Sequence, residues 1–161
     1  MDNHIQIDGW SRNIRFSACH VLLHHEKCSR LHGHSYAIHL KLKGSLGEDN
    51  FLIDFGRIKS VLKRYAGELD HKALVPTEND DIDIDKDDET GTVTMDMCGK
   101  RYQFPIGDVV FLPIPATTVE ELSGYILKRL LAEVSFPPGA TEISLGIDEG
   151  PGQGAWVTEV L

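Results

Sequence analysis

The stretch that decides the fold is His20-Val-Leu-Leu-His-His-Glu-Lys-Cys-Ser-Arg-Leu-His-Gly-His34, which holds five of the eight histidines of the chain within fifteen residues. In residues 35–42, which follow it, large apolar side chains alternate with small or polar ones, as in a strand with one buried face. Residues two apart in a strand point to the same face. His32 and His34 are therefore predicted to present two imidazoles to one point.

A third imidazole is expected from the strand that precedes this stretch. Ile14, Phe16 and Ala18 recur at every second position, and His20 continues their inward face. Three histidines without a fourth protein ligand are typical of a catalytic zinc site that keeps one position open for water or substrate. The pattern therefore predicts a metal centre at His20, His32 and His34. Zn²⁺ is the expected ion, although imidazole also suits other transition metals.

Cys28 lies four residues before His32, and the residues alone leave two roles open for it. Beside a metal and a histidine, a thiol readily forms the thiolate and can act as a base. Alternatively, Cys28 is a fourth ligand, which would make a closed structural zinc site without catalysis.

Composition narrows the class of protein. The chain has 161 residues, of which 41% are hydrophobic and 25% charged, and this is typical of one globular domain with a substantial core. A net charge of −9 argues against nucleic acid as a partner. Three cysteines without paired spacing indicate a reducing compartment. Neither a signal peptide nor a membrane-spanning apolar run is visible, so we expect a cytoplasmic location without a membrane partner.

The remaining elements predict an α+β domain. Residues 4–21, broken near Gly9, and residues 34–44 are expected to be strands. One helix is expected to begin at an Asp54 N-cap. A second begins at a capping box of Thr118 and Glu121 and ends at Pro137. Residues 141–149 and 155–161 complete an antiparallel four-stranded sheet with both helices on one face.

The basic residues of the first helix lie off its apolar stripe, and we interpret them as a solvated face in preference to a phosphate site. They are Arg57, Lys59, Lys63 and Arg64.

Residues 77–107 form an insertion within this single domain of residues 1–161. Residues 78–89 hold eight acidic side chains, but a calcium-binding EF-hand would need glycine at Lys86 or Asp88 and glutamate at Thr92 or Thr94. We therefore predict a solvated, mobile loop in preference to a cation site. Residues 92–97 and 101–104 are expected to form a hairpin.

Two motifs together resemble one enzyme family. Phe16-Ser-Ala-Cys-His20 followed by Cys28-Ser-Arg-Leu-His-Gly-His-Ser-Tyr36 is similar to the 6-pyruvoyl-tetrahydropterin synthase / 6-carboxy-tetrahydropterin synthase family. Shorter matches at residues 53–55, 69–71, 118–122 and 149 extend the resemblance over most of the chain outside the insertion. It implies the tunnelling fold, in which subunits join their sheets into a barrel. It also implies a homo-hexamer of two face-to-face trimers, with active sites between subunits.

The resemblance also implies roles for individual residues. Cys28 matches the general base of the family, and Asp70 and His71 match the pair that works with it in proton transfer. Glu149 matches the carboxylate that anchors the pterin, and Thr118 matches a threonine that helps to hold the ring. By pattern alone, Glu149 is either an inward carboxylate at a strand end, which needs a partner, or an exposed residue beyond that end.

The implied activity is that of a carbon–oxygen lyase. Its substrate would be 7,8-dihydroneopterin triphosphate and its product 6-carboxy-5,6,7,8-tetrahydropterin, with loss of triphosphate and acetaldehyde, on the route to the 7-deazaguanine bases of queuosine and archaeosine. The spacing from Cys28 to His32 looks like this type. The alternatives are a 6-pyruvoyl-tetrahydropterin synthase that retains the side chain, a pterin-binding relative without elimination, and a structural zinc protein. A minor one is cleavage to a hydroxymethyl pterin with Glu26 as base.

Overall fold

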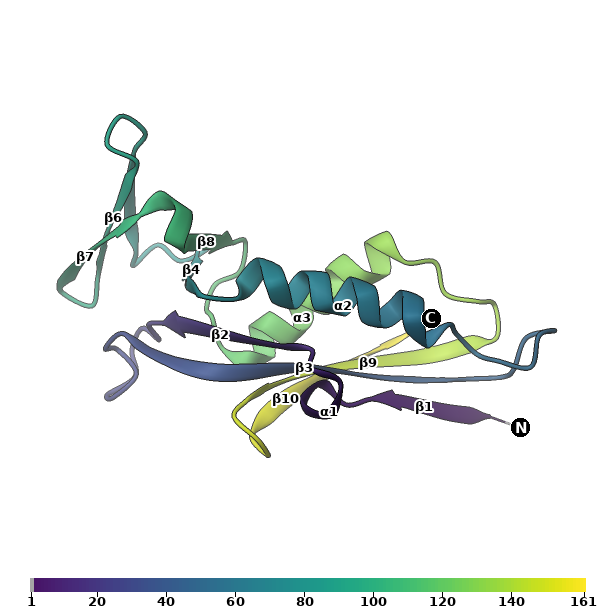
Figure 1. Ribbon diagram of the computed structural model, residues 1–161. Helices are drawn as coiled ribbons and strands as arrows, with labels where there is room; N and C mark the ends of the chain where they lie inside the picture. Colours follow the sequence, from purple (N-terminus) through teal and green to yellow (C-terminus); the bar gives the residue numbers. More distant parts are fainter. Residues whose placement is uncertain (1) are drawn as a thin grey trace.

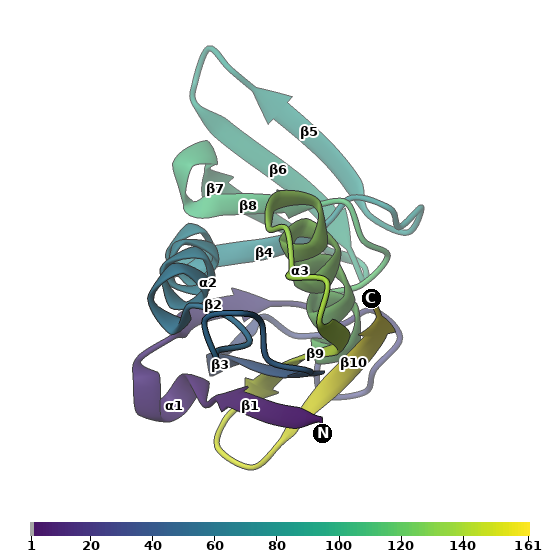
Figure 2. The same ribbon diagram turned by 90° about the vertical axis from the view of Figure 1, so that its right-hand side faces the viewer.

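The computed structural model describes residues 2–161 (Figures 1 and 2). Its elements, in chain order, are β1 (Asn3–Ile7), α1 (Gly9–Arg12), β2 (Arg15–His20), β3 (His32–Gly44), α2 (Phe55–Leu69), β4 (Lys72–Pro76), β5 (Asp83–Asp87), β6 (Thr92–Met97), β7 (Lys100–Pro105), a 3₁₀ turn (Ile106–Asp108), β8 (Val109–Leu112), α3 (Val119–Glu133), β9 (Ala140–Glu149) and β10 (Gly154–Val160).

The main sheet is built around β3. It has seven strands in the order β10-β9-β3-β2-β4-β8, and β1 also pairs with β3. One edge of β3 pairs with β2 over residues 32–37 and with β1 over residues 40–44, while the other edge pairs with β9. These pairings are antiparallel, whereas β4 runs parallel to both β2 and β8. The pairings of β3, the long central strand, therefore determine where the histidines lie.

The predicted four-stranded antiparallel sheet is too small, and its purely antiparallel character is wrong. The sheet is mixed because β4 and β8 add a parallel edge. Four of the five residues of β4 are buried, so its sequence lacks the alternation that marks a half-buried strand. The predicted break near Gly9 is confirmed, and there the chain makes the short helix α1 between β1 and β2.

Both long helices cover one face of the main sheet, as expected (Figure 2). The Asp54 side chain caps α2 by accepting from the N–H groups of Gly56 and Arg57, and Thr118 caps α3 by accepting from the N–H of Glu121. The buried faces of the two helices pack against the inward residues of β2, β3 and β9 in one hydrophobic core. The capping signals thus identified both helix starts correctly.

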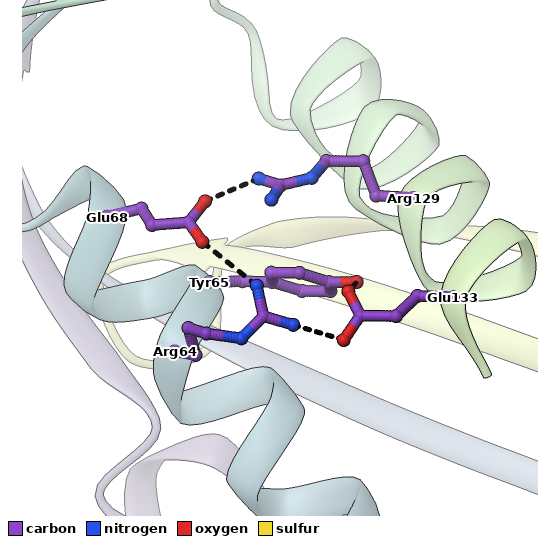
Figure 3. A network of polar contacts seen from close by, with 5 residues as sticks. All are labelled: Arg64, Tyr65, Glu68, Arg129 and Glu133. Atoms are coloured by element: carbon purple, nitrogen blue, oxygen red, sulfur yellow. Dashed lines mark hydrogen bonds and ion pairs between the residues drawn. The ribbon is translucent and has the colours of Figure 1, made fainter.

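The basic residues of α2 are exposed or half-buried, and one of them joins the two helices (Figure 3). The Arg64 guanidinium donates to Glu68 on its own helix and to Glu133 on α3, and Arg129 of α3 also donates to Glu68. The Tyr65 hydroxyl donates to Glu133 over 2.7 Å. At Arg64 the basic charge therefore serves a helix–helix contact.

The insertion forms a second sheet, so the prediction of a loop and a hairpin is only partly right. The β6–β7 hairpin is present, but β5 from the acidic segment pairs antiparallel with β6 and makes a three-stranded sheet. Aspartates disfavour strands, which is why the pattern hid β5. Within the described residues, no helix combines the length and apolar character needed to cross a membrane.

Candidate active site

Three imidazoles meet at the end of β2 and the start of β3. The register pairs His20 with His32, and Ala18 with His34, so all three rings project from the same sheet face. One ring nitrogen from each histidine lies within 4.8 Å of those of the other two. The predicted trio therefore comes together, from neighbouring strands, in a grouping that can hold one metal ion.

Hydrogen bonds assign a free nitrogen to two of these rings. Nδ1 of His20 lies 2.9 Å from the carbonyl oxygen of Thr117, and Nδ1 of His32 lies 2.7 Å from that of Arg30. A carbonyl only accepts, so each Nδ1 carries a proton, and in the neutral ring Nε2 keeps its lone pair. Metal-binding histidines are oriented by such outer contacts.

The cluster contains buried polar atoms that the described chain leaves unsatisfied. Nε2 of His20 and Nε2 of His34 are buried without a hydrogen-bond partner among residues 2–161. Burial lowers the pKa of His20 to about 4, which keeps this ring neutral at pH 7. Neutral imidazoles with inward lone pairs fit a divalent transition metal, and the chemistry of the donor set is therefore compatible with zinc.

Glu149 joins the cluster from the neighbouring strand. Its register partner is Tyr36, two residues beyond His34, and its Oε2 lies 3.8 Å from Nε2 of His34. Gln153 donates to the other carboxylate oxygen over 2.9 Å. Glu149 thus ends β9 on the inward face.

The N-terminus of α3 closes another side of the cluster. Thr117, which is fully buried, contacts His20 through its carbonyl, and Thr118 follows it as the helix cap. Thr118 also lines a cavity of about 310 Å³ beside Val21, Leu22 and the next residues of the loop that leads to Cys28.

Cys28 lies outside the imidazole grouping. Its N–H donates to Nδ1 of His25 over 3.1 Å, and its carbonyl accepts from the N–H of Leu22 over 2.8 Å. Within the described residues, the grouping of possible metal ligands at this site holds the three histidines without the Cys28 sulfur.

Asp70 and His71 lie between the end of α2 and the start of β4, beside Ser17 of β2. The carboxylate of Asp70 accepts from the N–H of Ser17 over 2.7 Å and lies 2.8 Å from Nδ1 of His71. The Ser17 hydrogen bond is the largest of the effects that lower the pKa of Asp70. His71 takes a left-handed backbone conformation, with φ of 58°, and its side chain is 84% exposed.

His71 lines a cavity of about 610 Å³ whose wall includes Ser17, Cys19, Gly33 and Ser35. These four residues alternate with the imidazole-bearing positions of β2 and β3, but Ala18 and His34 also line the cavity, so it adjoins the strand segment that carries His34. One chain therefore brings together the histidines, Glu149 and the start of α3. The Asp70–His71 pair lies outside the imidazole grouping, and His71 shares a cavity wall with His34.

Four contributors to the site were not anticipated from the sequence: the carbonyls of Thr117 and Arg30, the ring of Tyr36 and the amide of Gln153. Backbone carbonyls carry no side-chain signal. Tyr36 follows the inward phase of His32 and His34, and that phase was a usable signal for it. Its ring lies 5.6 Å from that of His34, centroid to centroid.

Comparisons with known proteins identify the family of the chain. Residues 10–159 match the family described as "6-pyruvoyl tetrahydropterin synthase". A protein of Methanocaldococcus jannaschii, named "Putative 6-carboxy-5,6,7,8-tetrahydropterin synthase", is 35% identical over 98% of this chain and 97% of its own length. A Halobacterium salinarum protein, named "Probable 6-carboxy-5,6,7,8-tetrahydropterin synthase", is 33% identical over 89% of this chain and 81% of its own.

Solved structures match the fold over its full length. The 6-pyruvoyltetrahydropterin synthase of Plasmodium vivax, in a form described as an "E37A catalytic residue mutant", superposes with a TM-score of 0.90 at 25% identity. That match covers 100% of this chain and 99% of the other. The corresponding Plasmodium falciparum enzyme gives a TM-score of 0.89, also at 25% identity.

Proposed function

Because the chain belongs to the 6-pyruvoyl tetrahydropterin synthase family, we propose that it is a zinc-dependent enzyme acting on 7,8-dihydroneopterin triphosphate. With water, this substrate would give 6-carboxy-5,6,7,8-tetrahydropterin, triphosphate and acetaldehyde, a carbon–oxygen lyase reaction. The names of the archaeal relatives and the three-residue gap between Cys28 and His32 favour this product over 6-pyruvoyl-tetrahydropterin. The reaction would supply a precursor of 7-deazaguanine bases in the cytoplasm.

The observation that carries the proposal is the imidazole cluster with its buried, unpartnered nitrogens. His20, His32 and His34 would hold the zinc ion, each through the nitrogen that points into the cluster. When bound, the ion supplies a positive charge that polarises hydroxyl or carbonyl oxygens of the substrate side chain.

Glu149 would anchor the pterin ring. A carboxylate accepts two parallel N–H donors, and the 2-amino group and the neighbouring ring N–H of a pterin present two such donors. Gln153 holds one carboxylate oxygen in place, and this contact orients the group toward the cluster. Thr118, which caps α3 next to the Thr117 that contacts His20, would help to hold the ring.

Proton transfer falls to Cys28, Asp70 and His71. The Cys28 thiolate would accept protons from the substrate side chain. Asp70 accepts the His71 ring N–H and thereby sets the tautomer in which the other ring nitrogen can take or return a proton. Since the His71 side chain is 84% exposed and lies outside the imidazole grouping, we propose that the pair serves a site completed by a second copy of the chain. A homo-hexamer of two trimers, with sheets joined into a barrel, is the expected assembly.

The test is to incubate zinc-loaded protein with 7,8-dihydroneopterin triphosphate and to identify the products by mass, with acetaldehyde measured separately. We expect acetaldehyde and the carboxy product in equal amounts. His32→Ala should abolish turnover, whereas His4→Gln, which changes a histidine of β1 outside the cluster, should not.

Three other results would overturn the proposal. Triphosphate release without acetaldehyde would indicate the 6-pyruvoyl product. Pterin binding without turnover would indicate a non-catalytic relative. Unfolding on chelation, without pterin affinity, would indicate a structural zinc protein.

A further inference from the structure

The inserted sheet packs against the segment that carries Cys28. This segment, residues 21–31, joins β2 to β3 and is called the Cys28 loop below. Its first residue, Val21, is buried in a second hydrophobic cluster with Val93, Met95 and Met97 of β6. Leu23 is partly buried against the same cluster. The insertion therefore shares a core with the Cys28 loop.

Two polar contacts also join the insertion to the Cys28 loop. Nζ of Lys100, at the start of β7, donates to the carbonyl of Ser29 over 2.9 Å. Nε2 of His24 lies 2.9 Å from a carboxylate oxygen of Asp81, just before β5. The two contacts fall on either side of Cys28, and one of them is at the residue that follows it.

The Cys28 loop has few other supports. It contains no helix or strand, and the side chains of residues 24–27 are exposed. Its internal hydrogen bonds, among them Leu22 N–H to the Cys28 carbonyl and Ser29 N–H to the His25 carbonyl, close the loop on itself. They do not hold it against the body of the domain. Loops with few buried contacts open locally at low free-energy cost.

A catalytic base needs closer positioning than such a loop provides alone, since productive geometry tolerates errors of only about 0.5 Å. We propose that the inserted sheet β5–β6–β7 is a brace for the Cys28 loop. Lys100 and Asp81 are its positioning residues, and they act on Cys28 through Ser29 and His24. The expected effect on catalysis rests on the proposed role of Cys28 as the base. The expected effect on the order of the loop does not.

Lys100 offers a sharp test because a matched control lies beside it. Lys100→Met removes the donor and keeps most of the length of the side chain, and Lys100→Arg restores a donor. Arg101→Met removes the neighbouring exposed cation, which pairs with Asp96 inside the hairpin. The readouts are amide hydrogen exchange at Leu22 and Ser29, the alkylation rate of Cys28 by iodoacetamide followed by peptide mass spectrometry, and kcat and KM for the pterin triphosphate.

In Lys100→Met we expect exchange and Cys28 alkylation to rise roughly 3- to 10-fold, as loss of one ordinary hydrogen bond produces, because solvent screens the charge of the exposed Lys100. A displaced base should lower kcat by about 10-fold with KM nearly unchanged. Lys100→Arg should restore all three values, and Arg101→Met should leave them at the wild-type level.

Unchanged exchange and alkylation in Lys100→Met would overturn the brace, and so would an equal rise in Arg101→Met. A rise in both without a fall in kcat, in a protein that turns over the substrate, would overturn the link to catalysis. If the wild-type protein has no turnover, the proposed function fails, and exchange and alkylation alone decide on the brace.

Discussion

Two regions of the molecule differ in whether their buried polar atoms have hydrogen-bond partners. Each region contains a tyrosine with a fully buried side chain. Tyr36 stacks on Phe16 at the imidazole cluster, with ring centroids 4.7 Å apart, and its hydroxyl has no hydrogen-bond partner within residues 2–161. Tyr65 lies between α2 and α3, and its hydroxyl donates to Glu133 in the network of Figure 3.

The difference concerns what each region stabilises. Between the helices, each cation finds a carboxylate, and the contacts hold two elements of the same chain together. At the imidazole cluster, buried nitrogens and a hydroxyl remain unpaired, which costs free energy in the protein alone. Unpaired buried groups are expected where a ligand completes them. The predictions below test this contrast.

The largest effect is expected at Cys28. If it is the base and not a ligand, Cys28→Ala should lower kcat by about 10²- to 10⁴-fold while zinc stays bound, since general-base catalysis contributes factors of this size. Turnover assays and metal analysis after dialysis measure the two properties. Loss of zinc in this variant would indicate that Cys28 is a fourth ligand and that the site is a structural zinc site.

Removal of one imidazole should affect the metal first. In His34→Ala, zinc affinity should fall by more than about 100-fold, because changes in residues that only orient metal ligands already cost up to that factor. A competition titration with a chromophoric chelator measures the affinity. His39→Gln is unsuitable as a control because His39 is buried, whereas His4→Gln should bind zinc like the wild-type protein. Equal affinities in all three proteins would contradict a site at this cluster.

Asp70 should make stability depend on acid pH. Its pKa lies below the usual 3.8 in the folded state, chiefly through the Ser17 N–H, so its ionised form stabilises the fold above that value and the contribution is lost as pH falls through the lower, folded pKa. Asp70→Asn should lower the free energy of unfolding by about 0.5–1 kcal/mol at pH 7, a value reduced because solvent screens the half-exposed carboxylate. Urea titrations should show this gap narrowing below about pH 4. A gap that is independent of pH would mean that the carboxylate charge contributes nothing.

The smallest effects compare the two tyrosines directly. Tyr65→Phe removes one of the two donors to Glu133 and should cost about 1 kcal/mol, whereas Tyr36→Phe removes a hydroxyl without a partner and should cost roughly 0 kcal/mol in metal-free protein. Urea unfolding of both variants measures the pair. A larger cost at Tyr36 than at Tyr65 would remove the contrast between the two regions.

Much of the fold and of the site could be predicted from side-chain periodicity and from helix-capping residues. The inward phase around His32 and His34, and the caps at Asp54 and Thr118, identified the central strands, both helices and the imidazole trio. The parallel strands β4 and β8 could not be found, because a strand of four or five residues buried on both faces has no period. The strand β5 was missed for another reason, since its aspartates disfavour strands.

The remaining gaps at the site have a different physical origin. The carbonyls of Thr117 and Arg30 orient His20 and His32, but backbone atoms are the same in every residue. The position of Asp70 and His71 depends on the edge of β2 against which they lie, and only the pairing of β2 with β4 decides that edge. The pattern of side chains along the sequence therefore does not reveal which distant strands pair.

The pairing of β3 with β9 has a consequence for biosynthesis. Residues 45–139 intervene between these two strands, so while the chain emerges from the ribosome one edge of β3 stays open until β9 has followed. An open edge of this kind can pair with a strand of another nascent chain. Thr117 and Glu149 also emerge well after His34, so metal capture by a fully formed site can only follow translation of most of the protein. If the cluster holds zinc as proposed, zinc starvation should accordingly affect maturation more than synthesis.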